Sequence, residues 1–409
     1  MKEVLQFKQS TSSVIFYFTR KNGKNFGSSE RLIISDIIFS VVKSKSYFES
    51  IIFCNEGKYP DVDYVSCLVI LGAVNIFEKE TIGKILSQDE RNFLENVKIK
   101  SIKEISIEFL HSKQLNEKLS VPSWIFDNWT KQIGLKRTIT FIESNHKKFS
   151  TYFRVNLLRR EVSSVKRVIE DSGNDAEQLK LLPGCLKFAH DSNFTQIKSL
   201  FQQGDIEIQD LGSQIISKLA APKRNTLIVD FCAGTGGKTL AMGSELKNSG
   251  KIYSIDIDRG RIKKLKKRLI GTGIENVWPM VISSLNDVKL IKLNNKIDTV
   301  LVDVPCSGFG TLRRNPDLKW RFSYNMLTVM NKLQHDILER ASLLCKVGGF
   351  LVYATCSSLY EENQQIVSDF LVKNNHFMRT DNKLTLEKQN VILDEEWKVY
   401  DFFGNIQLW

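Results

Sequence analysis

The spacing of hydrophobic residues divides the chain into regions with different periods. Over residues from about 29 to 115, apolar side chains recur every three or four positions for several turns, which predicts amphipathic helices. Ser28 or Ser29, followed by Glu30, is a plausible start for the first of them. This region contains no catalytic motif, so we expect it to pack or to bind a partner.

The next region, from about 120 to 205, mixes short strands with helices. A proline-led helix is predicted in VPSWIFDNWTKQIG. A strand and then a basic amphipathic helix are predicted in STYFRVNLLRREVSSVKRVIEDSG. Two further strands with turns are predicted in LLPGCLKFAH and FQQGDIEIQD. Together these elements indicate a small α+β module.

From about residue 206, short apolar segments rich in β-branched residues alternate with helical segments. The predicted strands are TLIVDF, KIYSID, VWPMVI, IDTVLVD and GFLVYAT. Alternating strands and helices predict an α/β fold with a mostly parallel, doubly wound sheet. We therefore predict three domains: helical over 1–119, small α+β over 120–205, and α/β over 206–409.

Composition and charge restrict the class of protein. The 58 Lys and Arg residues exceed the 46 Asp and Glu residues, giving a net charge of +12. Either a polyanionic partner or a lysine-rich, solvated surface explains this excess. No stretch approaches the roughly 20 apolar residues that span a bilayer, and the apolar run near the N-terminus is short and interrupted. We expect no secretion signal and no membrane association.

The seven cysteines are odd in number and scattered, with no C-x-x-C pair. This pattern favours neither a disulfide framework nor a metal site, and a reducing cytoplasm fits it best.

Unusual residues follow four of the five predicted strands. CAGTGGKT follows the first strand, Asp256 ends the second, DVPCSGFG follows the fourth and TCSS follows the fifth. In an open parallel sheet, ligands bind beyond the carboxyl ends of the strands. We therefore expect these four segments to meet at one edge of the sheet.

The glycine-rich segment from 232 to 239 suits the close approach of a ligand to the backbone. A phosphate-binding P-loop requires glycine where Cys232 stands, and the dinucleotide fingerprint requires a small residue where Thr239 stands. Asp256, twenty-two residues after Gly234, suits the two hydroxyls of a ribose. The segment predicts a ribose-bearing cofactor, with a tight turn alone as the alternative.

Two cysteines at strand ends favour chemistry, although a single cysteine is usually buried and inert. These two are Cys306 and Cys356. Cys232, inside the glycine loop, is interpreted as structural. The cysteines expected to lie in the core are Cys54, Cys67, Cys185 and Cys345.

A thiolate can add to carbon 6 of a pyrimidine, which makes carbon 5 nucleophilic enough to take a methyl group from a sulfonium donor. Asp303 is the candidate acid that supports a proton on ring nitrogen 3 during the attack. A base must then remove the proton from carbon 5 so that the enzyme leaves by elimination.

These motifs resemble the RsmB/Sun family of ribosomal RNA 5-methylcytosine methyltransferases, in the NOL/NOP/Sun superfamily. The resemblance rests on QDLGSQIISKLAAP, IVDFCAGTGGKT, DVPCSGFGTLRRNPDLKW and LVYATCSSLYEENQQIV. PSWIFDNW and FRVNLLR resemble the family's linking RNA-binding module, and GSSERLIISDIIFSVVKSKSYF is loosely similar to its NusB-like N-terminal domain. The resemblance implies a Rossmann-like catalytic domain behind these two.

The resemblance also implies a role for each matching residue. Cys356 matches the nucleophile, Cys306 matches the cysteine that assists product release, and Asp303 matches an acid close to cofactor and base. The implied cofactor is S-adenosylmethionine, with Asp256 as its ribose carboxylate. The loop around the methionine part of the cofactor is matched by Cys232, Ala233, Gly234, Thr235, Gly236, Gly237 and Lys238.

Two segments depart from the family pattern. After the third strand, MVISSLND places Ser283 or Ser284 where the family usually has an adenine-side Asp, and Asp287 lies further on. The C-terminus reads YDFFGNIQLW in place of an Asp-Gly-Phe-Phe strand.

Basic residues near the motifs are candidate phosphate contacts. Those that follow the Asp-Pro-Cys motif are Arg313, Arg314, Lys319 and Arg321. The run from Arg259 to Arg268 covers most of a helix, which is more typical of a solvated face.

The resemblance implies S-adenosylmethionine-dependent methylation of carbon 5 of a cytosine in RNA, with small-subunit ribosomal RNA favoured, through a covalent Cys356–C6 adduct in a monomeric enzyme. Three alternatives stay open: a tRNA cytosine methyltransferase, a DNA cytosine methyltransferase, and an rRNA-binding assembly factor that has lost activity. The second cysteine and the upstream module argue against DNA, and the intact Cys306, Cys356, Asp303 and Lys238 argue against lost activity.

Overall fold

The computed structural model describes residues 1–22, 26–55, 58–59, 61–110, 112, 114–147, 150–188, 194–195, 197–220 and 222–391. Contacts group the chain into two compact units. One comprises residues 1–147 and 311–326, and the other comprises residues 148–310 and those from 327 onward. The three-domain division stays a prediction, and each unit is described by itself.

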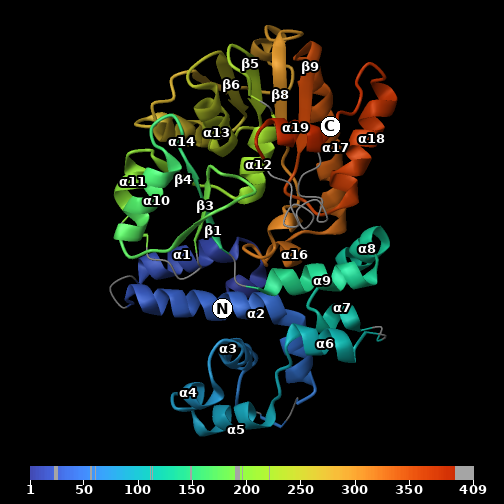
Figure 1. The fold of residues 1–409 in the computed structure, drawn as a ribbon. Helices are drawn as coiled ribbons and strands as arrows, with labels where there is room; N and C mark the ends of the chain where they lie inside the picture. The colour runs from blue at the N-terminus through green and yellow to red at the C-terminus, as the bar shows by residue number, and fades with distance from the viewer. Residues whose placement is uncertain are drawn as a thin grey trace. The chain divides into compact units, whose positions relative to one another are not determined.

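The first unit is helical, as the sequence predicted (Figure 1). Its helices are α1 (Thr11–Lys21), α2 (Ser28–Phe53), α3 (Tyr64–Val74), α4 (Lys79–Gly83), α5 (Gln88–Asn96), α6 (Ile102–Glu108), α7 (Leu115–Lys118), α8 (Ser123–Ile133), α9 (Leu135–His146) and α16 (Leu318–Arg321). Side-chain caps fix several starts: Ser87 and Ser101 each form a capping box with a Glu three residues later, at the beginnings of α5 and α6.

One cysteine of this unit contradicts its prediction. Cys67 is buried in α3, but Cys54 is exposed. Cys54 lies just beyond the last turn of α2, where Phe53 is also exposed, so the apolar stripe of the helix no longer faces the core. Burial of Cys54 was predicted from its apolar sequence neighbours, but at the end of α2 those neighbours do not cover it.

The second unit begins with a four-stranded antiparallel sheet of order β2-β3-β1-β4. Its elements are β1 (Thr151–Val155), α10 (Val162–Asp171), β2 (Ala176–Gln178), β3 (Cys185–Phe188), α11 (Lys198–Gln202) and β4 (Ile206–Ile208). Phe153 and Phe188 pack with ring centroids 4.4 Å apart, and Ile169 of α10 joins the same core. The predicted strands and the basic amphipathic helix are confirmed.

A five-stranded parallel sheet of order β7-β6-β5-β8-β9 forms the rest of this unit. The strands are β5 (Leu227–Phe231), β6 (Lys251–Asp256), β7 (Val277–Val281), β8 (Ile297–Asp303) and β9 (Cys345–Ala354). The helices are α12 (Leu211–Leu219), α13 (Gly237–Leu246), α14 (Arg259–Leu269), α15 (Val288–Ile291), α17 (Tyr324–Ser342), α18 (Gln364–Lys373) and α19 (Asn382–Lys388). All five predicted strands are confirmed.

Each face of this sheet has its own core, because successive side chains of a strand point to opposite faces. Leu301 of β8 packs with α12, α13 and α19 on one face. Its neighbours Val300 and Val302 pack with α15, α17 and α18 on the other. Helices on both faces make the sheet doubly wound, which confirms the predicted Rossmann-like α/β class.

The chain reverses its direction across the sheet between β5 and β8. From β5 it moves outward through β6 to β7, and it then returns to β8 on the other side of β5. Ligands bind at such a switch point, beyond the carboxyl ends of the strands. The C-terminal segment YDFFGNIQLW lies outside the described residues. Within the part of the chain that the structure describes, no helix combines the length and apolar character needed to cross a membrane.

Candidate active site

A cavity of about 710 Å³ lies at the carboxyl ends of the parallel strands. Four segments that are far apart in the sequence meet at this cavity, and nearly all the site residues predicted in them line it. Those that line it are Cys232, Ala233, Gly234, Thr235, Gly237, Lys238, Asp256, Asp303, Cys306 and Cys356. Of the predicted residues, Gly236 alone is not among the lining residues.

Gly236 has a packing role instead. It caps the N-terminus of α13 with φ +86°, and a Cβ at this position would lie 2.1 Å from Cδ1 of Leu265 in α14. Gly234 has φ +58° and open space around its missing Cβ. Close packing therefore requires a glycine at 236. At Gly234 the absence of a side chain instead leaves space inside the cavity.

Cys232 adopts a left-handed conformation with φ +64° and is half-buried at the cavity wall. Burial raises the pKa of its thiol, and the carboxylates of Asp256 and Asp303 raise it further. A neutral thiol is a poor nucleophile, so this environment agrees with a structural role.

Asp256 closes the glycine loop onto the end of β6. Its Oδ2 accepts a hydrogen bond from the backbone N–H of Gly234 at 2.8 Å, and its Oδ1 accepts one from Asp258 N–H at 2.8 Å. A carboxylate has about four acceptor positions, so both oxygens retain capacity for hydroxyl donors. Asp256 thus combines a fixed orientation with room for a ribose.

Lys238 and Asp303 form an ion pair across the cavity floor. Lys238 Nζ lies 2.6 Å from Asp303 Oδ2, and thereby joins the glycine loop to the Asp-Pro-Cys loop. Burial alone would lower the pKa of Lys238, but the adjacent Asp303 carboxylate outweighs burial and raises it. Lys238 is therefore a fixed positive charge beside the cavity.

The two predicted reactive thiols lie in direct contact. Cys306 Sγ is 3.2 Å from Cys356 Sγ, and the backbone N–H of Cys356 donates to Cys306 Sγ at 3.3 Å. Cys356 is exposed and Cys306 is half-buried. The hydrogen bond between them lowers the pKa of Cys356, with help from Lys238, and raises the pKa of Cys306, as burial also does. The exposed thiol is thus the better nucleophile.

A buried network behind the thiols was not predicted. Glu362 is fully buried, accepts the backbone N–H of Ser307 at 2.8 Å and also bonds the Ser307 hydroxyl. Gln334 donates to the same carboxylate at 3.0 Å, and Ser307 Oγ lies 3.0 Å from Ser357 Oγ. Ser307 directly follows Cys306 in the chain, and Ser357 directly follows Cys356. The network therefore holds the backbone beside both thiols. The signal for Glu362 was its place in LYEENQQIV, six residues after Cys356.

Asp230 of β5 was also missed. It is buried, lines the cavity and accepts the hydroxyl of Thr239 at 2.5 Å. Burial raises the pKa of this carboxyl to about 7. A strand-internal Asp among apolar residues, IVDF, was the available signal.

The segment after β7 lines the cavity through Ser283 and Ser284. Asp287 is turned back onto this segment: it accepts the N–H of Ser283 at 2.9 Å and its hydroxyl at 3.1 Å, and it caps α15. Both serines lie at the cavity wall, and Asp287 holds their turn.

Among the basic residues after the Asp-Pro-Cys motif, Lys319 was wrongly predicted to face phosphate. Lys319 is only 5% exposed and donates to Lys43 O at 2.8 Å, and its burial lowers the pKa of its amine to about 7. Arg313 donates to Ser144 O at 3.0 Å, and Arg321 pairs with Asp317 at 3.1 Å. The segment folds into the helical unit, which sequence spacing does not reveal.

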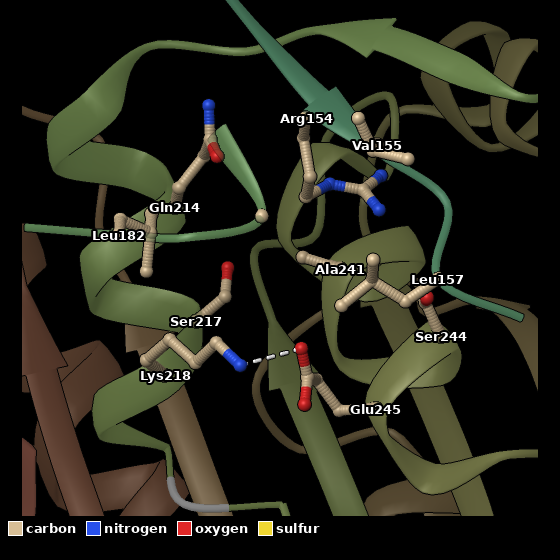
Figure 2. A pocket seen from close by; sticks show the side chains of 11 residues that line it. Arg154, Val155, Leu157, Leu182, Gln214, Ser217, Lys218, Ala241, Ser244 and Glu245 are labelled. Carbon is tan, nitrogen blue, oxygen red and sulfur yellow. Dashed lines mark hydrogen bonds and ion pairs between the residues drawn. The ribbon is translucent and has the colours of Figure 1, made fainter. Parts of the chain in front are cut away.

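A smaller cavity of about 30 Å³ lies between β1 and helices α12 and α13 (Figure 2). Lys218 and Glu245 form an ion pair of 2.6 Å along one side. Buried Arg154 donates through Nε to Gln209, a lining residue of the large cavity, at 2.7 Å. The small cavity has room for about two water molecules, so it is a gap in the packing of this unit and is too small for a substrate.

Comparison with known proteins agrees with this site. Residues 217–401 match the family model described as 16S rRNA methyltransferase RsmB/F. The probable ribosomal RNA small subunit methyltransferase B of Bacillus subtilis (strain 168) is 26% identical over 303 residues, which cover 72% of this chain and 64% of the relative. The ribosomal RNA small subunit methyltransferase B of Photorhabdus laumondii is 30% identical over 261 residues, covering 61% and 57%.

The chain therefore spans about three fifths of the length of these curated relatives. Among solved structures, the crystal structure of PH0851 has a TM-score of 0.70 and 26% sequence identity, and the match covers 90% of this chain and 87% of that one.

Proposed function

We propose that this chain, whose residues 217–401 belong to the RsmB/F methyltransferase family, transfers a methyl group from S-adenosylmethionine to carbon 5 of a cytosine in RNA, with small-subunit ribosomal RNA as the favoured substrate. The observation that carries the proposal is the pair of thiols 3.2 Å apart beside the large cavity. We further propose that the enzyme works as a monomer in the cytoplasm, where a reducing environment keeps both thiols free.

The cavity fits the cofactor. Its volume of about 710 Å³ accommodates a nucleoside with a methionine side chain. Asp256 offers acceptors for the ribose hydroxyls, and Ile257 and Ile282 line the cavity beside it as apolar neighbours for a base. Gly234 leaves space for the methionine part. S-adenosylmethionine supplies an electrophilic methyl group when bound, and the remaining chemistry falls to the protein's side chains.

Cys356 is the proposed nucleophile, which adds to carbon 6 of the cytosine. Asp303, held by Lys238, supports a proton on ring nitrogen 3 as the bond forms. Cys306, a half-buried thiol in contact with Cys356, assists release: a base takes the proton from carbon 5, and elimination then breaks the Cys356–C6 bond and returns the electron pair to Cys356 as its thiolate. The cytosine must leave its stack to reach the thiols, at a cost of a few kcal/mol, so a loop or single strand is the favoured context.

Trapping of the covalent adduct tests this proposal. RNA containing 5-fluorocytosine should form a protein–RNA adduct that survives denaturing electrophoresis with the unaltered chain. Cys356→Ala should give neither adduct nor product. Cys306→Ala should still attack but release poorly, so that it accumulates an adduct even with ordinary RNA. If Cys356→Ala forms the stable adduct and Cys306→Ala does not, the two roles are reversed.

A further inference from the structure

Helix α14, which lies between β6 and β7, has an unusual distribution of charge. Seven of its eleven residues are Lys or Arg and none is Asp or Glu. Only Ile262 and Leu265 are buried, so the cationic side chains cover the outward surface. Arg261 pairs loosely with Asp258, and Arg268 pairs with Glu207 at 2.6 Å. Among the described residues, the four lysines at 263, 264, 266 and 267 form no ion pair.

This arrangement costs the helix stability. Like charges four residues apart, such as Arg259 with Lys263 and Lys263 with Lys267, are destabilising by roughly 0.2–0.5 kcal/mol per pair. Arg259 and Arg261 also occupy the first turn, where the helix dipole disfavours cations and only the Asp258 cap compensates. An ordinary solvated helix relieves such repulsion with interspersed acids. The uncompensated positive charge of α14 therefore indicates a polyanionic partner that neutralises it.

A second pair of cations is fixed by a buried carboxylate. Asp205 has no exposed side-chain surface, and its two oxygens accept Nε of Arg159 at 2.9 Å and Nε of Arg160 at 3.1 Å. The arginine side chains are 38% and 46% exposed. Within the described ranges each arginine uses only Nε on Asp205, so the terminal guanidinium nitrogens remain for a ligand. One negative charge holds two positive ones in place.

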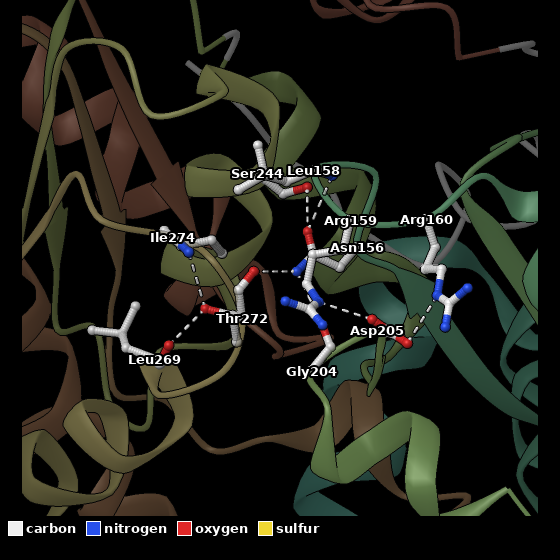
Figure 3. Close-up of polar contacts among 10 residues, drawn as sticks. All are labelled: Asn156, Leu158, Arg159, Arg160, Gly204, Asp205, Ser244, Leu269, Thr272 and Ile274. Carbon is white, nitrogen blue, oxygen red and sulfur yellow. Dashed lines mark hydrogen bonds and ion pairs between the residues drawn. The ribbon is translucent and has the colours of Figure 1, made fainter.

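Asn156 joins this arginine pair to the end of α14 (Figure 3). Its amide donates to Gly204 O at 3.0 Å and to Thr272 O at 2.8 Å, and its oxygen accepts Leu158 N–H and Ser244 Oγ–H. All four hydrogen-bonding positions of the buried amide are satisfied. Because Thr272 lies in the turn that follows α14, the arginine turn and the basic helix are fixed relative to each other.

We propose that α14 and the Arg159–Arg160 turn form one phosphate-binding face that holds the RNA backbone next to the active site. The proposal rests on the proposed function for the identity of the polyanion. The face is continuous with the cavity at two points: Arg261 lines the cavity, and Arg268 donates to Thr235 O of the glycine loop at 2.8 Å. Lysine contacts to phosphate carry affinity without sequence information, so this face positions RNA and leaves selection of the base to the cavity.

Charge reversal on the helix tests the face. The full-length chain carrying Lys263→Glu and Lys267→Glu is compared with one carrying Lys383→Glu and Lys388→Glu, exposed lysines of α19, a helix that contributes no lining residue to the large cavity. Both variants change the net charge equally. Binding of a fluorescein-labelled single-stranded RNA is measured by anisotropy over a range of KCl concentrations. The α14 variant should bind at least about tenfold more weakly and lose roughly 1.4 from its log–log salt slope, while the α19 variant keeps both values.

Arg160→Ala provides a second variant that preserves the fold, because Arg159 still pairs with Asp205. It should weaken RNA binding severalfold while calorimetry shows unchanged binding of S-adenosylmethionine. Equal RNA affinities for the α14 and α19 variants overturn this inference alone. Absence of RNA binding by the unaltered chain, or failure to trap an adduct, instead overturns the proposed function on which it rests.

Discussion

The contact between Cys306 and Cys356 shifts the pKa values of the two thiols in opposite directions. Cys356 is exposed and its pKa is lowered by the hydrogen bond from Cys306 and by Lys238, whereas Cys306 is half-buried and its pKa is raised. Because the thiolate is the nucleophilic form, the lowered pKa favours negative charge on the exposed sulfur. The Lys238–Asp303 ion pair keeps a cation beside that sulfur.

Removal of Cys306 should therefore change the titration of Cys356. In Cys306→Ala the hydrogen bond is lost, so the pKa of Cys356 should rise toward its ordinary value of 9.0. Below that pH less thiolate is present, and alkylation of Cys356 by iodoacetamide should slow, with its pH midpoint moving upward. Mass spectrometry of the modified peptide measures this shift. Exposed Cys54 is the internal reference, and a midpoint unmoved by the substitution would disprove the coupling of the thiols.

Asp256 should contribute to cofactor affinity through its charge. Asp256→Ala should weaken binding of S-adenosylmethionine by roughly 10- to 100-fold, because a hydrogen bond to a charged group contributes about 1.5–3 kcal/mol. Asp256→Asn is the matched control, since it retains an acceptor for Gly234 N–H but loses the charge. Calorimetry that gives the same dissociation constant for all three proteins would remove Asp256 from the binding site.

Individual site residues were predictable where a strand end and a motif coincided. Cys306, Cys356 and Asp256 lie in or beside the cavity for this reason. Glu362 was not predicted: its place in the motif after Cys356 was a signal, but a carboxylate in a polar-looking segment gives no sign that it will be buried. Gly236 was assigned to the cofactor loop but does not line the cavity, and its contact with Leu265 depends on how α13 and α14 pack.

At the scale of elements, the parallel sheet followed from local sequence. Strands such as β8 and β5 are short apolar runs. In the helices that connect the strands, apolar residues recur every three or four positions, so the two kinds of element could be told apart from the sequence. Short helices such as α11 were not predicted, because five residues give too few turns for a period to emerge. The pairing order across the sheet was not predicted, because no single strand shows which strand it will lie beside.

The junction between α13 and α14 depends on the second glycine of the loop. Gly236→Ala should lower the free energy of unfolding by about 1–3 kcal/mol more than Gly234→Ala, since overpacking adds to the shared strain of positive φ. Urea denaturation followed by tryptophan fluorescence measures the difference. The double variant Gly236→Ala with Leu265→Ala should lose less than the sum of the two single variants, because the added methyl group no longer meets the leucine side chain. Equal losses at the two glycines would exclude the steric explanation.

At the scale of the whole molecule, the helical unit is discontinuous in sequence. Residues 311–326 belong to the same unit as residues 1–147. Trp320 Nε1 donates to Val42 O at 2.9 Å and Lys319 Nζ donates to Lys43 O at 2.8 Å, so this segment completes the middle of α2. DVPCSGFGTLRRNPDLKW was interpreted as one motif, but the chain changes units within it, and hydrophobic periodicity does not show which core a segment joins.

Loss of Trp320 should therefore loosen α2. Trp320→Ala should increase amide hydrogen exchange in residues 40–48 of the full-length chain, because the Val42 contact and the packing of Lys45 over the indole ring are lost. Exchange in β5 and β6 should stay as it is. Trp278→Ala, at a partly exposed tryptophan of β7, is the matched control and should leave α2 unchanged. Unaltered exchange in α2 of Trp320→Ala would show that the segment contributes nothing to the helical unit.

The position of residues 311–326 also determines the order in which the protein is completed on the ribosome. The chain is synthesised from its N-terminus, so α2 emerges long before Trp320 and Lys319 are joined to it. Until residue 326 has left the exit tunnel, the carbonyl groups of Val42 and Lys43 lack the donors that they have in the finished protein. Helix α2 is therefore translated early but lacks the contacts from Lys319 and Trp320 while all of residues 148–310 are translated. A nascent chain that stalls before residue 326 will carry the glycine loop and Cys306 but no completed helical unit, and such incomplete packing should make it more susceptible to proteolysis.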